Sequence, residues 1–176
     1  MLSCAVSETS PVSVRGEMAL PAPSPPGTAL LDEVVARRRS VRAYTTQELT
    51  WDEAGRLFWA AQGITDGSGH RAAPSAGALY PLELYAVTPQ GAVHYVPEGH
   101  KVEQLDIGDV RAELSSAALG QSAVREAPFV MVVVGVVART RAKYGDRAER
   151  YVAIEVGHAA HGAVLEATAL GLGHSC

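Results

Sequence analysis

Apolar residues recur at helical spacing in four segments of this chain, and this pattern predicts four helices. The segments cover about residues 28–38, 50–63, 109–119 and 147–170. The second has the clearest boundaries, because Thr50 and Glu53 form a capping-box pattern at its start and Gly63 is typical of a helix end. The last is apolar almost all round, which predicts that it is buried on most sides and favours a place in a dimer interface.

Strand-like patterns occur in two places. Leu82–Thr88 alternates between apolar and polar residues, and Ala92–Val96 follows after a short turn, so the two are expected to pair as a hairpin. The apolar run over 129–138 is rich in β-branched residues and too short to cross a bilayer, which predicts a buried central strand. The order of these elements predicts an α+β fold with a mainly antiparallel sheet flanked by helices.

The 176 residues divide into an arm and one domain. Residues 1–28 are rich in Pro, Ser and small side chains, a composition that cannot bury enough apolar surface to fold by itself. We therefore expect a disordered or extended N-terminal arm over 1–28. The remaining residues, 29–176, are expected to form a single domain, which is long enough for a substantial core.

Charge and cysteine content exclude several classes of protein. The net charge of -4 gives no reason to expect nucleic acid or an anionic membrane as a partner. Cys4 and Cys176 lie at opposite ends and form no disulfide framework. The first residues lack the basic start and long apolar stretch of a signal peptide. A cytoplasmic protein in a reducing compartment is the expectation.

A compact cationic cluster follows the first predicted helix. Arg38, Arg39, Ser40 and Arg42 combine fork-shaped charged donors with a hydroxyl, which suits a phosphate dianion. A solvated basic helix end has the same composition. The cluster alone therefore leaves both interpretations open.

A loop of small residues precedes the predicted hairpin. Pro74, Ser75, Ala76 and Gly77 would allow backbone N–H groups to approach a planar ring system, and glycine can adopt a positive φ. The alternative is a tight turn that only leads the chain into the hairpin.

Two other groups of side chains could take part in chemistry. Lys143 and Tyr144 follow the apolar run and offer a proton donor or acceptor, although a surface turn would contain the same residues. Glu155, His158 and His161 are spaced by three on the last helix. This spacing is loose and no second ligand cluster exists, so no metal site is predicted.

The strings Arg37-Arg-Arg-Ser-Val-Arg42 and Arg71-Ala-Ala-Pro-Ser-Ala-Gly-Ala-Leu-Tyr-Pro81 together resemble the FMN-dependent nitroreductase family. Within this family, Ala73–Pro81 is similar to the SagB-type dehydrogenases, which oxidise azoline rings in ribosomal peptides. The resemblance extends from about Leu30 to Gly173. It implies a nitroreductase-like fold and a homodimer with FMN at the interface.

The resemblance also implies roles for single residues. The segment with Arg38, Arg39, Ser40 and Arg42 matches the one that contacts the FMN phosphate and ribityl chain. The loop Pro74–Gly77 matches the one that lies against the isoalloxazine of flavin held by the other subunit. Lys143 and Tyr144 resemble the Lys-Tyr pair to which SagB-type enzymes owe proton transfer.

The function implied is oxidation of thiazoline or oxazoline rings in a peptide that a partner protein delivers. Two alternatives remain open: an NAD(P)H-dependent nitro or quinone reductase, and a non-catalytic family member or subunit. Relatives continue beyond Gly171-Leu-Gly173 with a further strand, a helix and a basic residue that helps to hold the flavin. The resemblance therefore implies that 29–176 lacks the C-terminal part of the family fold.

Overall fold

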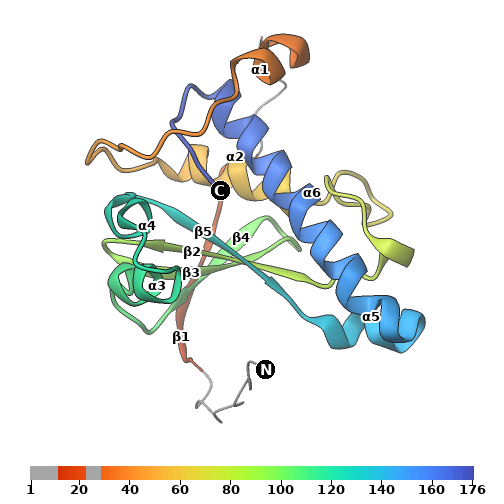
Figure 1. The fold of residues 1–176 in the computed structure, drawn as a ribbon. Helices are drawn as coiled ribbons and strands as arrows, with labels where there is room; N and C mark the ends of the chain where they lie inside the picture. The colour runs from red at the N-terminus through yellow and green to blue at the C-terminus, as the bar shows by residue number, and fades with distance from the viewer. Residues whose placement is uncertain (1–11, 23–28) are drawn as a thin grey trace.

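A five-stranded antiparallel sheet forms the frame of the protein in the computed structural model, which describes residues 12–22 and 29–176 (Figure 1). The strands lie side by side in the order β1 (Val14–Ala19), β4 (Lys101–Leu105), β3 (Gly91–Val96), β2 (Leu82–Thr88) and β5 (Val130–Gly135). The α-helices are α1 (Leu31–Arg37), α2 (Trp51–Gln62), α3 (Arg111–Ala117), α4 (Ser122–Glu126), α5 (Val137–Tyr144) and α6 (Ala148–Ala169). Two short 3₁₀ turns are η1 (Ala76–Ala78) and η2 (Gly145–Arg147). The predicted α+β fold is confirmed.

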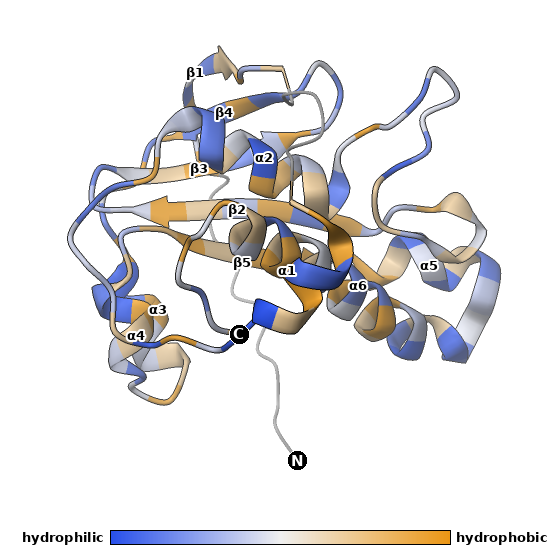
Figure 2. Cartoon of the chain, turned by 90° about the horizontal axis from the view of Figure 1, so that it is seen from above, coloured by the Kyte–Doolittle hydropathy of each residue, from blue (hydrophilic) through white to orange (hydrophobic). Residues whose placement is uncertain are grey.

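The hydrophobic core lies between one face of the sheet and the helices α2 and α6. Figure 2 shows hydrophobic residues along β2 and α6, two of the elements that meet in this layer. Phe58 of α2 is fully buried and stacks on Tyr95 of β3 with ring centroids 4.8 Å apart. Burial raises the pKa of Tyr95, whose hydroxyl oxygen lies 2.9 Å from His100 Nδ1. The side chains of the core therefore join three elements that are distant in sequence.

The boundaries of α2 agree with the sequence prediction. The Glu53 N–H donates to Thr50 Oγ1 at 3.2 Å, and the Thr50 N–H donates to Glu53 Oε2 at 2.8 Å. These two bonds form the reciprocal capping box and satisfy donors that the first helical turn leaves free. At the other end, the Gly63 N–H donates to the Trp59 carbonyl at 2.7 Å.

The hairpin of β2 and β3 is confirmed, whereas the prediction of a central position for the apolar run is wrong. The run forms β5, which pairs with β2 alone among the described strands and lies at the edge of the sheet. The sequence showed that both faces of this strand are apolar. It did not show how many strands pair with it, because side-chain hydropathy reports on the two faces of a strand and not on its backbone hydrogen bonds to neighbouring strands.

Part of the segment predicted as an arm belongs to the sheet. Residues 14–19 form β1, which pairs with β4 and is fastened by ion pairs of Arg15 with Asp106 and of Lys101 with Glu17. These contacts stabilise an extended segment that could not fold by itself. The predictions for residues 1–11 and 23–28 lie outside the described residues.

Helix α6 runs across the sheet and packs closely against α2. The two helices come close at Gly162, where an added Cβ would lie 2.5 Å from the carbonyl oxygen of Ala60. A side chain at this position would therefore push the two helices apart. The opposite face of α6 is exposed in the single chain, with Ile154, His158 and His161 along it.

We expect Gly162→Ala to lower the free energy of unfolding by about 1–3 kcal/mol, because the new methyl group overpacks against a backbone oxygen. Helix propensity alone predicts the opposite, a gain of about 1 kcal/mol. The matched control is Gly157→Ala on the same helix, where an added Cβ meets nothing within 4 Å and the gain should be seen. Urea denaturation of both variants gives the comparison, and equal stability of the two would contradict the prediction.

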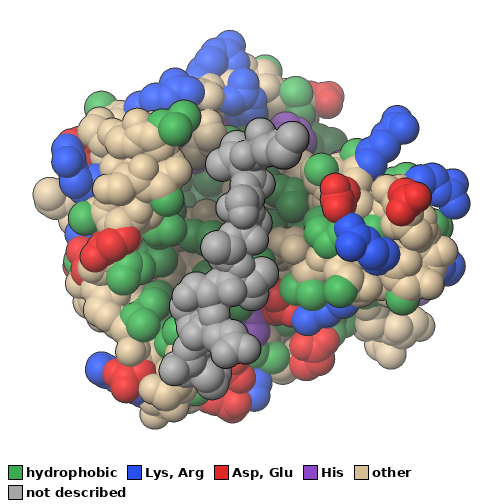
Figure 3. All heavy atoms as spheres, turned by 60° about the horizontal axis from the view of Figure 1, so that its bottom comes forward, with side chains coloured by type: hydrophobic (Ala, Val, Ile, Leu, Met, Phe, Trp, Pro, Cys, Tyr) green, Lys and Arg blue, Asp and Glu red, His purple; other side chains and the backbone are tan. Residues whose placement is uncertain are grey.

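The face of the sheet that points away from α2 and α6 carries a polar row. His94 of β3 lies between two carboxylates, with Nε2 2.8 Å from Glu83 of β2 and Nδ1 3.1 Å from Glu103 of β4. Figure 3, which turns the underside of the molecule forward, shows charged side chains of both signs among hydrophobic side chains. Among the described helices, none is long and apolar enough to cross a membrane.

Candidate functional site

The loop between Ser75 and Tyr80 has a strained backbone. Gly77, Ala78 and Tyr80 have positive φ values of 65°, 54° and 43°. Glycine adopts this conformation freely, but a residue with a side chain does so at a cost of about 1–3 kcal/mol. Such strain persists only where the surroundings impose it, and it concentrates at binding and catalytic sites. The conformation of the loop predicted to face a ring is therefore held by contacts with the rest of the domain.

Two hydrogen bonds fix the start of this loop. The Tyr80 N–H donates to Ser75 Oγ at 2.9 Å, which closes the loop on itself. The Ala76 N–H donates to Glu155 Oε1 of α6, also at 2.9 Å. Glu155 is only 3% exposed, so the loop is anchored to the interior of the domain.

Two arginines hold the end of the loop. The guanidinium of Arg71 lies over the ring of Tyr80, 4.7 Å from its centroid, and also donates to Gln62 Oε1 at 3.3 Å. Arg139 of α5 donates to the Tyr80 carbonyl at 3.4 Å and forms an ion pair with Glu83. Burial raises the pKa of Glu83, but the bonds from His94 and Arg139 outweigh it and hold this pKa below its usual value. Through Arg139, helix α5 is fastened to both the loop and the sheet.

The structure brings Lys143 and Tyr144, at the end of α5, up to this loop. A Cβ at Gly77 would lie 2.7 Å from Lys143 Nζ and 2.8 Å from Tyr144 Oη. Both polar ends therefore approach the same stretch of backbone, where the positive φ of 65° favours glycine. The structure thus brings together two predicted groups that are distant in sequence.

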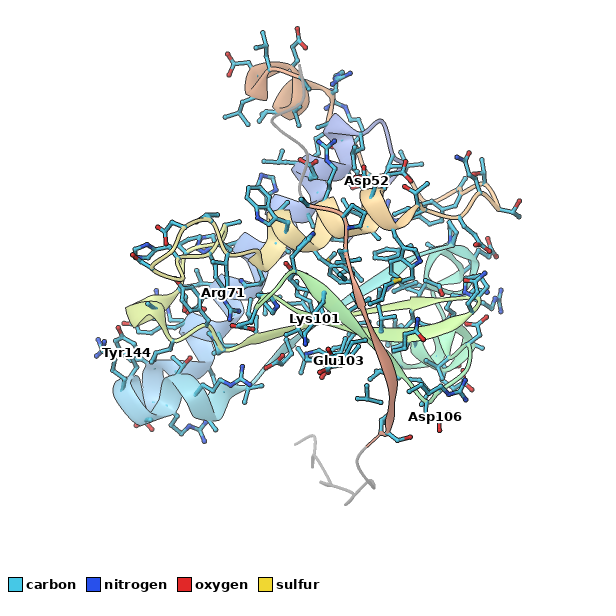
Figure 4. All side chains as sticks on the ribbon, turned by 180° about the vertical axis from the view of Figure 1, so that it is seen from behind. Asp52, Arg71, Lys101, Glu103, Asp106 and Tyr144 are labelled. Carbon is cyan, nitrogen blue, oxygen red and sulfur yellow. The ribbon has the colours of Figure 1, made fainter. Side chains whose placement is uncertain are left out.

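Aromatic and cationic side chains surround this pair. The ring of Tyr144 meets that of Tyr151 edge to face with centroids 5.0 Å apart, and the Arg147 guanidinium lies 5.8 Å and 5.7 Å from the two centroids. Lys143 is exposed and Tyr144 is half-buried. Figure 4, seen from behind, shows Arg71 and Tyr144 toward the same end of the molecule, away from Asp106.

The predicted cationic cluster lies elsewhere, beside the last described residues. The Val41 N–H donates to the His174 carbonyl at 2.8 Å, and Ser40 bridges to His174 in parallel. Burial, together with the charge of Arg38, lowers the pKa of His174. Arg38 and Arg42 form no ion pair within residues 12–22 and 29–176, which leaves their charges available to an anion.

Arg39 differs from its neighbours in the cluster. Its guanidinium donates to the carbonyl of Ala36 at 3.0 Å and to that of Arg38 at 2.7 Å. These bonds satisfy carbonyls at the end of α1, which is the usual task of a basic residue at a helix C-terminus. Among the predicted phosphate ligands, Arg39 is thus the arginine whose guanidinium already forms hydrogen bonds within the chain.

Helix α6 separates the two halves of the predicted site (Figure 1). Glu155 binds the loop through the Ala76 N–H. Thr168 lies near the cationic cluster, because its Oγ1 is 2.9 Å from Nε2 of His174, which pairs with Ser40. Glu155 and Thr168 are about 20 Å apart along the helix at the usual rise per residue. One chain therefore presents the two halves at different ends of α6.

An apolar groove of about 390 Å³ follows the free edge of β5. Met131 and Val133 of β5, Ala163 and Val164 of α6 and the segment 172–176 line it. None of the predicted loop, cluster or Lys-Tyr residues is among its lining. The lining also includes the polar side chains of Tyr44, Gln121, His174 and Ser175.

Comparison with known proteins assigns the class. A family model described as the nitroreductase family matches residues 35–176, which is most of the chain. This protein belongs to the nitroreductase family, whose members are oxidoreductases that typically bind FMN. The nitroreductase-like fold predicted from the sequence is confirmed.

Individual relatives agree with this assignment. A Methanocaldococcus jannaschii protein named putative nitroreductase MJ1384 is 42% identical over 149 residues, which cover 81% of this chain and 75% of the relative. The crystal structure of a putative nitroreductase from Ralstonia eutropha matches with a TM-score of 0.79 at 27% identity, over 94% of this chain and 80% of that one. The Escherichia coli microcin synthetase McbBCD complex matches with a TM-score of 0.62 at 26% identity, over 70% of this chain and 51% of that one.

Sequence reasoning did not find how the loop is supported. Arg71 begins the string that resembles the family, and Glu155 was noted for its spacing to His158 and His161, but nothing in the sequence indicates that these two residues and Arg139 meet at Ser75–Tyr80. No group of metal-binding side chains assembles around these residues or elsewhere in the described parts of the chain.

Proposed function

We propose that this protein is an FMN-dependent oxidoreductase that oxidises azoline rings, thiazolines or oxazolines, in a peptide to azoles. The convergence of Lys143 Nζ and Tyr144 Oη on the backbone at Gly77 carries this proposal. Oxidation of an azoline removes a hydride and a proton, so a proton acceptor is needed beside the hydride acceptor. The loop offers a surface for a planar ring, and the pair offers the proton acceptor at the same place.

The residues present fit FMN. The loop Pro74–Gly77 has only small side chains, and the buried Oε2 of Glu155 beneath it has no partner in the described residues. The cluster of Arg38, Ser40 and Arg42 is the proposed phosphate site, with Arg39 at its margin. When bound, FMN supplies a two-electron hydride acceptor, whereas the chain supplies binding, orientation and proton transfer.

A complete site under this proposal needs two copies of the chain. The cationic cluster and the loop lie at different ends of α6, so a flavin whose phosphate rests on one subunit would place its ring against the loop of the partner. The exposed face of α6, where Ile154 lies beside His158 and His161, is the surface that we propose for such a homodimer. This arrangement agrees with the dimer that the sequence resemblance implies.

The nature of the substrate is supported from two directions. The Lys-Tyr pair resembles the SagB-type pair, and the structure of a microcin synthetase complex, crystallised with a truncated pro-peptide, is similar to this chain. We therefore propose a peptide substrate delivered by a partner protein of a modification complex. The names of the first relatives favour a second candidate, reduction of nitro compounds or quinones with NAD(P)H as the electron donor.

The visible absorption spectrum of the gel-filtered protein, expressed with FMN supplied, tests the proposal. We expect a bound-flavin spectrum on a dimer-sized peak. Azoline oxidation is then measured as loss of two hydrogens from an azoline peptide by mass spectrometry, and the second candidate as NAD(P)H consumption with a nitroarene. A protein that stays colourless through FMN titration contradicts both candidates.

We expect Arg38→Ala to weaken FMN binding by about 1.5–3 kcal/mol, which is roughly a ten- to hundredfold rise in Kd, if its guanidinium contacts the phosphate. Fluorescence titration with FMN measures the affinity. Arg37→Ala is the matched control, because Arg37 is an exposed cation on the same helix and lies outside the proposed cluster. Equal affinity of the Arg38 variant and the unaltered protein would remove Arg38 from the phosphate site.

A further inference from the structure

The loop from Ser75 to Tyr80 does not maintain its own conformation. Two residues with side chains, Ala78 and Tyr80, are held at positive φ, which their local sequence does not favour. The hydrogen bond between Ser75 and Tyr80 closes the loop but does not fix where it lies on the domain. The position must therefore be set by contacts from other elements.

Glu155 makes the most deeply buried of these contacts. Glu155 is 3% exposed, and its carboxylate accepts from the Ala76 N–H at 2.9 Å, directly before Gly77. Arg71 and Arg139, by contrast, act on the other end of the loop at Tyr80. Glu155 thus links the ring-facing part of the loop to the rigid middle of α6.

A carboxylate is an unexpected choice for a position of this kind. Burying a polar group without a partner for each of its oxygens is costly, and no ion pair of Glu155 is formed in the described part of the chain. Its Oε2 has no hydrogen-bond partner there either. A residue that served packing alone would be apolar, because an apolar side chain fills the same space without that cost.

We propose that Glu155 is a positioning residue, which holds the loop through the Ala76 N–H in the conformation that binds the flavin ring. The inference rests on the proposed function for the identity of the ligand, but the restraint on the loop is a property of the protein alone. Glu155 need not touch the reacting atoms. Its effect reaches them through the placement of Gly77, and hence of Lys143 and Tyr144.

The test is Glu155→Met, which keeps the length of the side chain and removes both acceptor oxygens. Hydrogen exchange of the unliganded protein, read by mass spectrometry, should show the loop peptide exchanging roughly tenfold faster, since one buried hydrogen bond is lost and the Ala76 N–H is left without its acceptor. The Tm should not fall, because a buried oxygen without a hydrogen-bond partner is removed as well. If the flavin binds, its Kd should rise by a similar factor.

Two further variants separate positioning from packing. Glu155→Gln retains an acceptor oxygen and should restore loop protection. Glu166→Met alters the same residue type on the same helix, but Glu166 is half-buried and pairs with Arg56 at 2.6 Å, so this change should lower the Tm and leave the loop peptide unchanged. Restored protection in the glutamine variant would identify the hydrogen bond, not the packing, as the cause.

Two outcomes would overturn the inference. In one, Glu155→Met lowers the Tm while loop exchange stays the same, which would assign Glu155 to the core alone. In the other, loop exchange in Glu155→Gln is as fast as in Glu155→Met, which would show that the hydrogen bond is not the cause. Absence of FMN binding in the unaltered protein would instead reject the proposed function, and the exchange comparison on the unliganded protein would still decide the role of Glu155.

Discussion

Replacing Phe58 with alanine is expected to lower the free energy of unfolding by about 3–5 kcal/mol. Phe58 is 0% exposed, stacks on Tyr95 at 4.8 Å and meets Phe129 edge to face at 5.9 Å. It therefore joins α2 to β3 and to the segment that enters β5. Removal of the ring loses both its transfer free energy and these contacts, because the sheet and α6 cannot move inward together to fill the space. Urea denaturation monitored by circular dichroism measures the loss.

Trp51→Ala is the matched control for this prediction. Trp51 begins the same helix and is also a large aromatic residue, but it is 40% exposed. Its replacement should cost clearly less, since much of its surface stays in water in the folded state. Similar losses for the two variants would show that Phe58 does not occupy the centre of the core.

The elements that the sequence predicts well are those whose signals are local. The start of α2 follows from Thr50 and Glu53 because the capping box joins residues three apart. The hairpin of β2 and β3 follows from alternation and a short turn. In each case the residues that carry the signal are also the residues that make the contacts.

The strands β1 and β4 show why local signals fail elsewhere. Both are short and carry charged residues, and β1 lies in a segment whose composition suggests no fold. They pair through backbone hydrogen bonds, and the ion pair between Lys101 and Glu17, which are 84 residues apart, lies on this pair of strands. Such partners become evident only when the chain is folded.

Gly162 is a second case in which a contact between distant segments outweighs a local preference. Its neighbours on α6 predict that alanine would be the better residue, since glycine weakens a helix. The structure reverses this preference, because the Ala60 carbonyl of α2 occupies the space that a methyl group would need. Propensity describes a helix in isolation, whereas Gly162 is selected by the contact between two helices.

The loop of small residues and the Lys-Tyr pair of the candidate site could be predicted from the sequence, but the contacts that hold the loop in place could not. Small residues in a loop and a Lys-Tyr pair are visible as strings, and the structure brings them together at Gly77. The anchoring of the loop by Glu155 could not be read from a string, because it requires the position of α6 relative to η1. The separation of the loop from Arg38 likewise depends on the direction of α6.

The largest expected effect on activity is that of Lys143→Ala. Loss of a positioned proton-transfer group typically slows a reaction by about 10²–10⁴-fold. Lys143 is exposed, and its Nζ lies 5.6 Å from the Tyr144 ring centroid, so its removal should leave the core and the loop in place. We therefore expect flavin to remain bound while azoline oxidation slows by this factor. Single-turnover mass spectrometry with an azoline peptide measures the rate.

Arg125→Ala is the control for Lys143→Ala, since it removes one exposed cation from α4 and should leave the rate unchanged. Tyr144→Phe separates the two members of the pair, because it keeps the edge-to-face contact with Tyr151 and removes only the hydroxyl. If Lys143→Ala loses flavin and rate to the same extent, Lys143 is a binding residue and not the proton acceptor. If the azoline rate is unchanged but NAD(P)H-dependent nitroarene reduction falls, the pair serves the second candidate function. In that reaction it would donate a proton, whereas azoline oxidation requires a base that removes a proton from carbon.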